Sequence, residues 1–536
     1  MLSALAAFQG WYHPAWHNLN HDPLHWIWHA ASFLGTAYVV WGLCLAGYRV
    51  TLHPLAKIPG PKAAALTHGY ETYYGLVLGG QYFKRIKEMH SQYGPIIRIT
   101  PDEVHFDDPD FINEVYPTSL VRKTDKPLWV GKRSGTPQSM VATLKHETHR
   151  LRRGSITAFF STASIGRVEP ILKDKLERLL RRWSQLRDGE ILEMLSVFQA
   201  YASDNVTTYA FGDCFNFIND ESWGAEYFHS QEKYFKLTHI FGTFPMIMRL
   251  INSLPVWLMS MFIPNLSSMT EKQNWRVNRV REIRNSPDPD AIRNTIFEGI
   301  LSSNLPAEEK TDTRMAQDAQ LIALAGESTT GYTLAGVLFE LLSHPDHYER
   351  ARNEVISALS DDEEMVPSYA KVQNLPFLGA IIQEVLRLHP GVLSRMARIS
   401  PEKDIIFHDK RRGRTFTVPA GTPMSMTTLI THTNPAVFES PYEFRPQRWI
   451  DNPKLNLALI AFSRGARNCV GQEFARREMS MMVAAILKHY DVYQGQKGPA
   501  LELYDTTRER DIIANSEMII PMPAKGSHGL RVRFRS

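Results

Sequence analysis

Apolar residues recur with helical spacing over most of the chain beyond Gly154, and the long runs end at Gly, Pro or His. Strand-like sequence is limited to short stretches, chiefly residues 95–100 and 413–426. The polar stretches at 304–314 and 360–368 are typical of solvated loops between helices. Because the chain has no internal repeat, the pattern predicts one mainly helical (α+β) body that contains small sheets.

A separate apolar stretch lies near the N-terminus, where residues 30–48 contain no charged side chain. At about 1.5 Å per residue, a helix of this length just spans the roughly 30 Å hydrocarbon core of a bilayer. Asp22 is the one formal side-chain charge before the stretch, whereas Arg49 and Lys57 follow it, so the positive-inside rule places the rest of the chain in the cytosol. A cleaved signal peptide is less favoured, because no charged n-region precedes the stretch. A buried core helix is the other alternative.

The domain organisation follows from this interpretation. We expect a short lumenal N-terminus over residues 1–29, a transmembrane anchor over 30–48, a proline-rich hinge over 49–62 and a cytosolic globular domain over 63–536. Prolines cannot continue a helix and favour extended backbone, which is why the hinge is predicted to be stiff.

A second apolar stretch, residues 244–266, is broken by Pro255 and Pro264 and interrupted by Arg249. These breaks make it a poor transmembrane helix. We expect a loop that dips into the lipid headgroup region, with a buried pair of helices as the alternative.

Composition and charge narrow the function classes. Lys and Arg number 60 and Asp and Glu 56, and a net charge of +4 does not favour a nucleic-acid partner. The three cysteines, Cys44, Cys214 and Cys469, are too few and too dispersed for a disulfide framework or a zinc site. The bulk of the chain is therefore predicted to lie in a reducing compartment.

Cys469 stands in the glycine-rich stretch FSRGARNCVG, residues 462–471. Gly465 and Gly471 permit positive φ and the close approach of a flat, bulky group. A helix is predicted to begin around Gln472, and its positive end would stabilise a thiolate. A thiolate is a metal ligand or a nucleophile, and an inert buried cysteine is the plain alternative.

This stretch resembles, position by position, the haem-binding loop F-x-x-G-x-R-x-C-x-G of the cytochrome P450 superfamily. The resemblance implies the P450 fold, and it implies haem b (iron-protoporphyrin IX) with Cys469 as the axial ligand of the iron. It also implies that Phe462, Arg467 and Gly471 contact the cofactor.

Two further motifs appear in the order that this family requires. Glu384 and Arg387 lie three residues apart and share a helix face. Arg448, in PYEFRPQRW, matches the arginine that joins them in the family. The resemblance implies a buried structural triad that supports the loop carrying Cys469. Such a triad is costly unless it is fully hydrogen-bonded.

The second motif is LIALAGESTTGYTLAG, residues 321–336, within an apolar helix predicted from about Arg314 to Ser343. Glycine followed by Ser-Thr-Thr is locally unfavourable inside a helix, and local rules fail most often at functional sites. The resemblance implies that Ala325 lies beside the haem and that Gly326 opens a groove for dioxygen. It implies that Thr329 guides protons to the dioxygen. A core helix with small residues for tight packing is the alternative.

This helix departs from the family pattern A-G-x-(Asp/Glu)-Thr. Ser328 takes the place of the acid, and Glu327 comes one residue earlier. One residue rotates a side chain by about 100° around a helix, so Glu327 cannot replace the usual acid in a regular helix. Gly326, Glu327, Ser328 and Thr329 remain the expected catalytic residues. We expect proton delivery to pass through Ser328 and water.

The remaining cofactor contacts are cationic. His149 and Arg153 match the spacing of a family motif, Trp-x-x-x-Arg, that contacts a haem propionate, and Arg398 matches another such contact. With Arg467, these residues provide charge-assisted hydrogen bonds that would fix the orientation of the cofactor.

The sequence is most similar to fungal microsomal (class II) members of the P450 superfamily, especially the trichodiene oxygenase-like group. The resemblance implies a monooxygenase that hydroxylates or epoxidises a lipophilic substrate with O2, NADPH and an NADPH-cytochrome P450 reductase. It implies a single-pass protein of the endoplasmic reticulum membrane with a cytosolic catalytic domain in contact with membrane lipid.

Substrate and partner surfaces are predicted more loosely. A terpenoid or related fungal secondary metabolite is favoured, and a polyketide-derived scaffold comes next. The expected pocket walls are residues 104–145, the 244–266 stretch and Val392-Leu393. A positive docking face for the reductase is expected at three arginines, Arg464, Arg476 and Arg477. Two alternatives remain: a reductase-independent haem-thiolate isomerase or dehydratase, and a non-catalytic haem sensor.

Overall fold

The computed structural model describes residues 23–119, 121–244, 246, 258, 266–288, 295–359 and 364–536. The chain divides into two compact units, Met1–Lys57 and Ile58–Ser536. Most of the apolar stretch 244–266 lies outside the described residues, so its predicted conformation stays a prediction.

The first unit contains one long helix, α1, Pro23–Thr51, which covers the whole apolar stretch predicted at residues 30–48. Its candidate membrane span, Trp26–Thr51, is long and apolar enough to cross a bilayer, and none of its apolar window is buried against protein. Among the described residues it is the one helix that meets this test. The prediction of a buried core helix is therefore not supported, and the helix is consistent with a membrane anchor.

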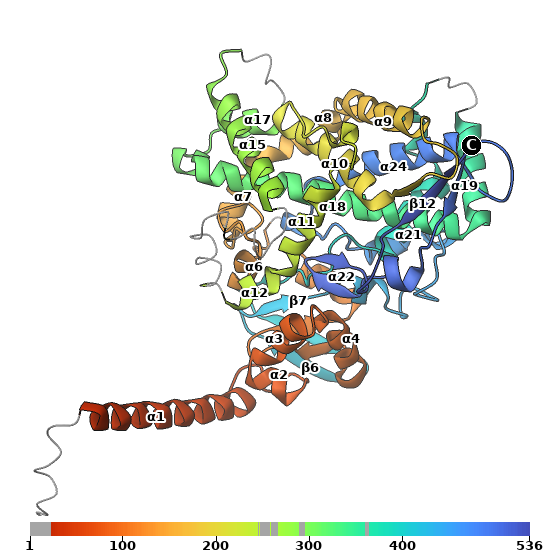
Figure 1. Cartoon of the computed structure of the whole chain (residues 1–536). Helices are drawn as coiled ribbons and strands as arrows, with labels where there is room; N and C mark the ends of the chain where they lie inside the picture. The colour runs from red at the N-terminus through yellow and green to blue at the C-terminus, as the bar shows by residue number, and fades with distance from the viewer. Residues whose placement is uncertain are drawn as a thin grey trace, which may run out of the picture. The chain divides into compact units, whose positions relative to one another are not determined.

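The second unit is mainly helical, as the sequence predicts (Figure 1). Its long helices are α4 Tyr82–Tyr93, α7 His146–Thr157, α9 Glu169–Trp183, α10 Met194–Phe211, α11 Ala225–Lys236, α15 Leu266–Asn285, α18 Asp312–Ser343, α19 Pro345–Ala358, α21 Pro376–Leu388 and α24 Gln472–His489. The shorter helices are α2 Lys62–Leu66, α3 Gly69–Thr72, α5 Ile112–Val115, α6 Leu128–Arg133, α8 Thr162–Gly166, α12 Thr238–Thr243, α17 Ile296–Ser302, α20 Tyr369–Val372, α22 Thr428–His432 and α23 Gln447–Asp451.

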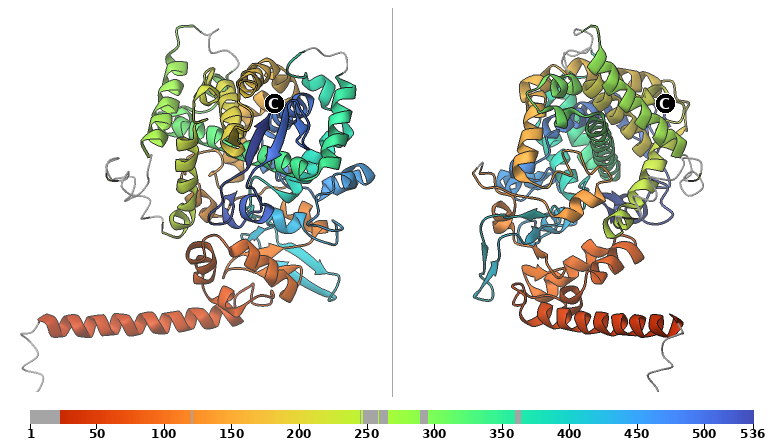
Figure 2. Two further views of the ribbon diagram at one scale, coloured as in Figure 1. Left: turned by 45° about the vertical axis from the view of Figure 1, so that its right-hand side comes forward. Right: turned by 90° about the vertical axis from the view of Figure 1, so that its left-hand side faces the viewer.

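Helix α18 runs through the middle of this helical body (Figures 1 and 2). It begins inside the polar stretch predicted as a loop, because the Thr311 side chain caps it by accepting a hydrogen bond from the Arg314 N–H. It packs against α10, α15, α21 and α24. Glycine permits the closest of these contacts: a Cβ added at Gly331 would lie 3.0 Å from the backbone nitrogen of Gln199 on α10.

The strands form small sheets, and those predicted at 95–100 and 413–426 are confirmed. One sheet has the order β1-β2-β7-β4, with β1 Ile96–Arg98, β2 Val104–Phe106, β7 Pro423–Ser425 and β4 Arg398–Ile399. A second has the order β3-β12-β9-β8, with β3 Ile191–Glu193, β12 Arg531–Arg535, β9 Ala500–Leu503 and β8 Asp491–Val492. Two hairpins complete the set: β5 Ile405–Asp409 with β6 Arg414–Val418, and β10 Ser516–Met518 with β11 Ile520–Met522.

The first sheet brings distant parts of the chain together at its edge strand β4. Strand β2 pairs in parallel with β7, and β7 pairs antiparallel with β4. Beyond β4, an isolated antiparallel bridge joins Ile399 to Asp125. Arg398 and Lys126, each next to a bridge residue, are thereby placed in one region although they are far apart in the sequence.

Candidate functional site

Cys469 lies on a tight turn that the preceding residues fix. Its N–H donates to the Phe462 carbonyl oxygen at 2.8 Å. Ser463 and Gly465 have φ of 56° and 71°, in the left-handed region. A Cβ added at Gly465 would lie 2.1 Å from the Pro117 carbonyl oxygen, so glycine is required there, as predicted. Gly471, which precedes α24, does not use positive φ, since its φ is −84°. A Cβ added there would lie 3.8 Å from a ring carbon of Phe160, and the close approach of a flat group stays a prediction.

The thiol of Cys469 has two properties that fit a side chain lining an internal crevice. Cys469 as a whole residue has solvent-exposed surface. Burial nevertheless raises its pKa, because protein atoms surround it on several sides. The Gly471 N–H and the Arg153 guanidinium oppose this rise in pKa. The predicted stabilisation of a thiolate by the helix start is therefore present, but desolvation outweighs it.

One face of α18 is also accessible. Ala325 is exposed and Thr329, one turn later, is partly exposed, whereas Glu327, Ser328 and Thr330 are buried. The Thr329 hydroxyl donates to the Ala325 carbonyl oxygen at 2.7 Å. Gly391, from the loop after α21, packs so closely that an added Cβ would lie 3.0 Å from the Thr329 Cβ. This face therefore presents a small side chain and a hydroxyl side by side.

The other candidates on α18 point elsewhere. Gly326 faces α10, where an added Cβ would lie 2.9 Å from a methyl carbon of Val206. The missing side chain at Gly326 lets α10 approach α18, and the groove for dioxygen stays a prediction. Glu327 and Ser328 are both buried and bind side chains of other helices.

Three of the predicted cofactor cations bind backbone or neutral side-chain oxygens. Arg153 donates to the carbonyl oxygen and side-chain oxygen of Asn468, both at 2.6 Å. Arg398 donates to the Ser463 hydroxyl at 3.1 Å and to the carbonyl oxygen of Ala397 at 3.0 Å. Arg467 donates to three carbonyl oxygens, those of Thr124, Thr143 and Leu144.

His149 lies among these cations. Burial lowers the pKa of His149 to about 2, and the positive charges of Arg467, Lys126, Arg153 and Arg398 contribute to the shift. In the described part of the chain, none of these four cations forms an ion pair with a carboxylate. Arg398 and Arg467 are buried, while Arg153 and Lys126 are partly exposed. Buried cations without anionic partners are costly, so the cluster fits a ligand that carries negative charge.

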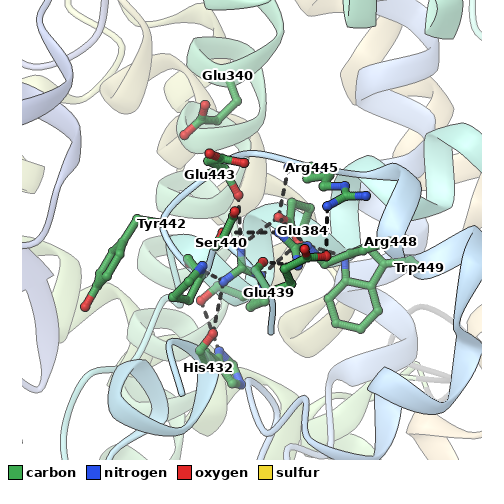
Figure 3. A network of polar contacts seen from close by, with 12 residues as sticks. Glu340, Glu384, His432, Glu439, Ser440, Tyr442, Glu443, Arg445, Arg448 and Trp449 are labelled. Atoms are coloured by element: carbon green, nitrogen blue, oxygen red, sulfur yellow. Dashed lines mark hydrogen bonds and ion pairs between the residues drawn. The ribbon is translucent and has the colours of Figure 1, made fainter. Parts of the chain in front are cut away.

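The predicted triad is present and fully hydrogen-bonded (Figure 3). The Glu384 carboxylate accepts from Nε and Nη2 of Arg387, at 2.8 and 2.6 Å, and from Arg448 Nε at 3.1 Å. The indole N–H of Trp449 and the backbone N–H of Arg445 also donate to it. Arg387 has further donors bonded to three carbonyl oxygens, those of His432, Pro441 and Glu443.

His432 connects the triad to the segment that precedes the cysteine turn. Its Nδ1 bonds the Arg387 carbonyl oxygen, and its Nε2 accepts from the Ile460 N–H at 2.8 Å. The tautomer is thereby fixed, with the hydrogen on Nδ1. Ile460 in turn accepts from the Ser463 N–H, so a continuous chain of hydrogen bonds leads from Glu384 to the turn.

Comparison with known proteins identifies the family. The family model described as Cytochrome P450 matches residues 65–507. The chain belongs to the cytochrome P450 family. It is 32% identical over 497 residues to "Cytochrome P450 monooxygenase tpcC" of Cochliobolus heterostrophus, covering 91% of this chain and 94% of that protein. It is a cytochrome P450 monooxygenase, and this family uses haem b with O2 and electrons derived from NADPH.

Two further relatives have more specific names. The chain is 32% identical over 498 residues to "Fusicoccadiene C-8 hydroxylase" of Phomopsis amygdali, covering 90% of this chain and 92% of the relative. It is 34% identical over 511 residues to "N-acetyltryptophan 6-hydroxylase ivoC" of Emericella nidulans, covering 93% and 96%.

The residues present fit haem. A thiol with accessible surface on a glycine turn suits an axial ligand, and the unpaired cation cluster around His149 suits two propionates. Lys126 also belongs to this cluster, although no sequence motif points to it, and its side-chain nitrogen donates to the Val141 carbonyl oxygen. Burial and the neighbouring Arg398 and Arg467 hold the pKa of Lys126 well below its usual range. The bridge between Asp125 and Ile399 places it there, and no local pattern signals that bridge.

The expected docking arginines differ from one another. Arg477 is buried, pairs with Glu169 at 2.8 Å and stacks on the Tyr369 ring, so it does not present a docking charge as predicted. Arg464 and Arg476 are partly exposed. The predicted pocket wall at Val392-Leu393 is likewise half wrong, since Leu393 is fully buried in the core.

Replacing the triad carboxylate by an amide, Glu384→Gln, is expected to lower the free energy of unfolding by about 3–5 kcal/mol, because it leaves buried arginines without their charge partner. The matched control, Asp174→Asn, breaks an exposed pair with Arg178 and should cost no more than about 1 kcal/mol. Urea denaturation followed by circular dichroism measures both. Equal losses in the two variants would contradict the assigned role of Glu384.

His432 makes stability depend on pH. Burial and the neighbouring Arg387 lower its pKa to about 3, against about 6.5 in an unfolded chain. Between these values the unfolded state binds the proton and the folded state does not. The free energy of unfolding therefore falls as the pH drops below about 6.5, by up to about 1.4 kcal/mol per pH unit.

His432→Gln removes this titration, so its stability should fall less steeply than that of the wild type between about pH 6 and pH 4. The control, His408→Gln, changes an exposed histidine of β5 and should retain the wild-type slope. Denaturation curves over a pH series provide the test, and parallel slopes for His432→Gln and the wild type would refute it.

Proposed function

We propose that this P450 inserts one oxygen atom from O2 into a lipophilic substrate, a terpenoid or related fungal secondary metabolite, with electrons delivered from NADPH by a cytochrome P450 reductase. The observation that carries the proposal is the accessible Cys469 thiol on its fixed turn, together with the cation cluster that lacks a carboxylate partner. A thiol and a set of cations are the protein groups that a haem-thiolate centre requires.

In this proposal Cys469 is the axial ligand, and a first set of residues holds the cofactor. His149, Arg153, Arg398 and Arg467 would hold the propionates, and Phe462, Gly471 and Ala325 would contact the macrocycle. When bound, haem activates dioxygen and transfers one oxygen atom to a C–H or C=C bond of the substrate. Cys469 would supply this centre with an electron-rich thiolate sulfur.

The chain's own contribution on the other side comes from α18. Thr329 holds and passes a proton at its hydroxyl, which now rests on the Ala325 carbonyl oxygen. The small side chain of Ala325 leaves room next to this hydroxyl. The triad of Glu384, Arg387 and Arg448 keeps the cysteine turn in place from behind.

The substrate class is supported by the name of one relative, a fusicoccadiene hydroxylase, and by the apolar stretch 244–266 that is expected to line the entrance. A polyketide-derived scaffold is the next candidate by resemblance. The relative named N-acetyltryptophan 6-hydroxylase favours including indole compounds in any substrate screen.

For location we propose a single-pass protein of the endoplasmic reticulum membrane. Residues 1–29 would be lumenal, 30–48 the anchor and 49–62 the hinge, with the catalytic domain, 63–536, in the cytosol and in contact with membrane lipid. Helix α1 supports the anchor. Arg464 and Arg476, partly exposed near the cysteine turn, would face the reductase.

The test is turnover of the full-length protein with a cytochrome P450 reductase, NADPH and ¹⁸O₂, offered a panel of terpenes, polyketide aromatics and indoles. We expect a product that contains one ¹⁸O atom and forms only when NADPH is present. A product of unchanged mass or one that has lost water, formed without NADPH, would instead establish an isomerase or dehydratase.

A further inference from the structure

Four helices meet at one buried carboxylate, that of Glu327. From α10, the Ser203 hydroxyl donates to its Oε2 at 2.8 Å. From α11, the Tyr227 hydroxyl donates to Oε1 at 2.9 Å, and the Gln231 side-chain amide donates to the same oxygen. Arg276 of α15 donates to the Tyr227 hydroxyl at 3.2 Å, which brings a positive charge to the network.

Gln231 binds two consecutive residues of α18. Its Nε2 donates to Glu327, and its Oε1 accepts from the Ser328 hydroxyl at 2.8 Å. All three side chains are buried, with exposed fractions of 0–3% for Glu327, Ser328 and Gln231. Every polar atom of the amide end therefore faces α18 rather than solvent.

The direction of these hydrogen bonds follows from the chemistry of the groups. An ionised carboxylate only accepts, so the amide nitrogen of Gln231 must face Glu327 and the amide oxygen must face Ser328. Ser328 then donates its single hydrogen to α11. Burial raises the pKa of Glu327, whereas Arg276 and the three donors oppose the rise by favouring the charged form.

This arrangement is poorly suited to proton transfer. An amide offers no readily exchanged proton between its oxygen and its nitrogen at neutral pH, so the path from Ser328 to Glu327 through Gln231 is a chain of hydrogen bonds and not a proton wire. The geometry of these hydrogen bonds suits the attachment of α11 to α18. Glu327 lies two residues after Ala325, about 200° around α18, on the side away from the accessible face.

We propose that Gln231 is a positioning residue, which fastens α11 to α18 through Glu327 and Ser328 and thereby sets how Thr329 is presented. The proposal rests on the proposed monooxygenase function and refines it: Ser328, at the position of the usual acid, anchors the helix and does not carry protons.

The first experiment measures the fastening without relying on turnover. Melting temperatures of the haem-loaded full-length protein are compared for Gln231→Met, Ser328→Ala and the double variant. Methionine keeps the shape of glutamine and removes its hydrogen bonds. The double variant is expected to melt no lower than the less stable single variant, because each change removes the same hydrogen bond.

A matched control separates this coupling from general damage to helix packing. Gln199→Met alters another buried glutamine that packs on α18, at Gly331, and its melting-temperature shift should add to that of Ser328→Ala. Additive shifts for Gln231→Met and Ser328→Ala would overturn the fastening, whether or not the protein proves to be a monooxygenase.

The second experiment distinguishes positioning from proton transfer. Hydrogen peroxide released per NADPH consumed reports how often protons are misdelivered during turnover. If Gln231 positions Thr329, then Gln231→Met and Ser328→Ala should each raise this ratio severalfold, to a similar value that the double variant does not exceed. The Gln199→Met control should keep the wild-type ratio.

Two outcomes would overturn the positioning role. If Ser328→Ala raises the peroxide ratio and Gln231→Met leaves it at the wild-type value, Ser328 carries protons. If neither variant changes the ratio while their melting temperatures remain coupled, Gln231 serves packing alone. Failure of the proposed function looks different, since the wild type would then form no NADPH-dependent oxygenated product.

Discussion

The presentation of Cys469 depends on the buried Glu384 carboxylate. It accepts five hydrogen bonds, from Arg387, Arg448, Trp449 and a backbone N–H, so the desolvation that a buried charge suffers is offset. Arg387 and His432 extend this network to the backbone at Ile460, two residues before the cysteine turn begins. The turn is thus held in place although its segment contains only one short 3-10 helix, Gly465–Arg467.

The charges of the molecule fall into two contrasting groups. The triad is closed, and each of its charged groups has partners within the chain. The cluster of Arg153, Arg398, Arg467 and Lys126 is open, because these cations bind carbonyl oxygens and crowd a neutral His149. Closed networks stabilise a fold, whereas open buried cations indicate where an anionic ligand belongs. The contrast supports the proposed cofactor site on physical grounds that are independent of the motifs.

Much of this could be predicted from sequence, because the decisive motifs are local. The structure contains three features that local sequence patterns predict: the turn around Cys469, the Glu384–Arg387 pair and the helix Asp312–Ser343. The sequence does not reveal that α10 packs on Gly326 or that Gly471 has an ordinary φ, because both features depend on tertiary packing. Lys126, Trp449 and Gln231 were missed because each reaches its partners only through tertiary contacts between distant segments.

The most direct test of the account is the visible spectrum of the dithionite-reduced protein with carbon monoxide, for the wild type and for Cys469→Ala. Thiolate ligation predicts a strongly red-shifted Soret band in the wild type that disappears in Cys469→Ala, because the thiolate donates electron density to the iron. An ordinary imidazole-type band in the wild type, or a red-shifted band that persists without Cys469, would contradict the assignment of this cysteine as the axial ligand.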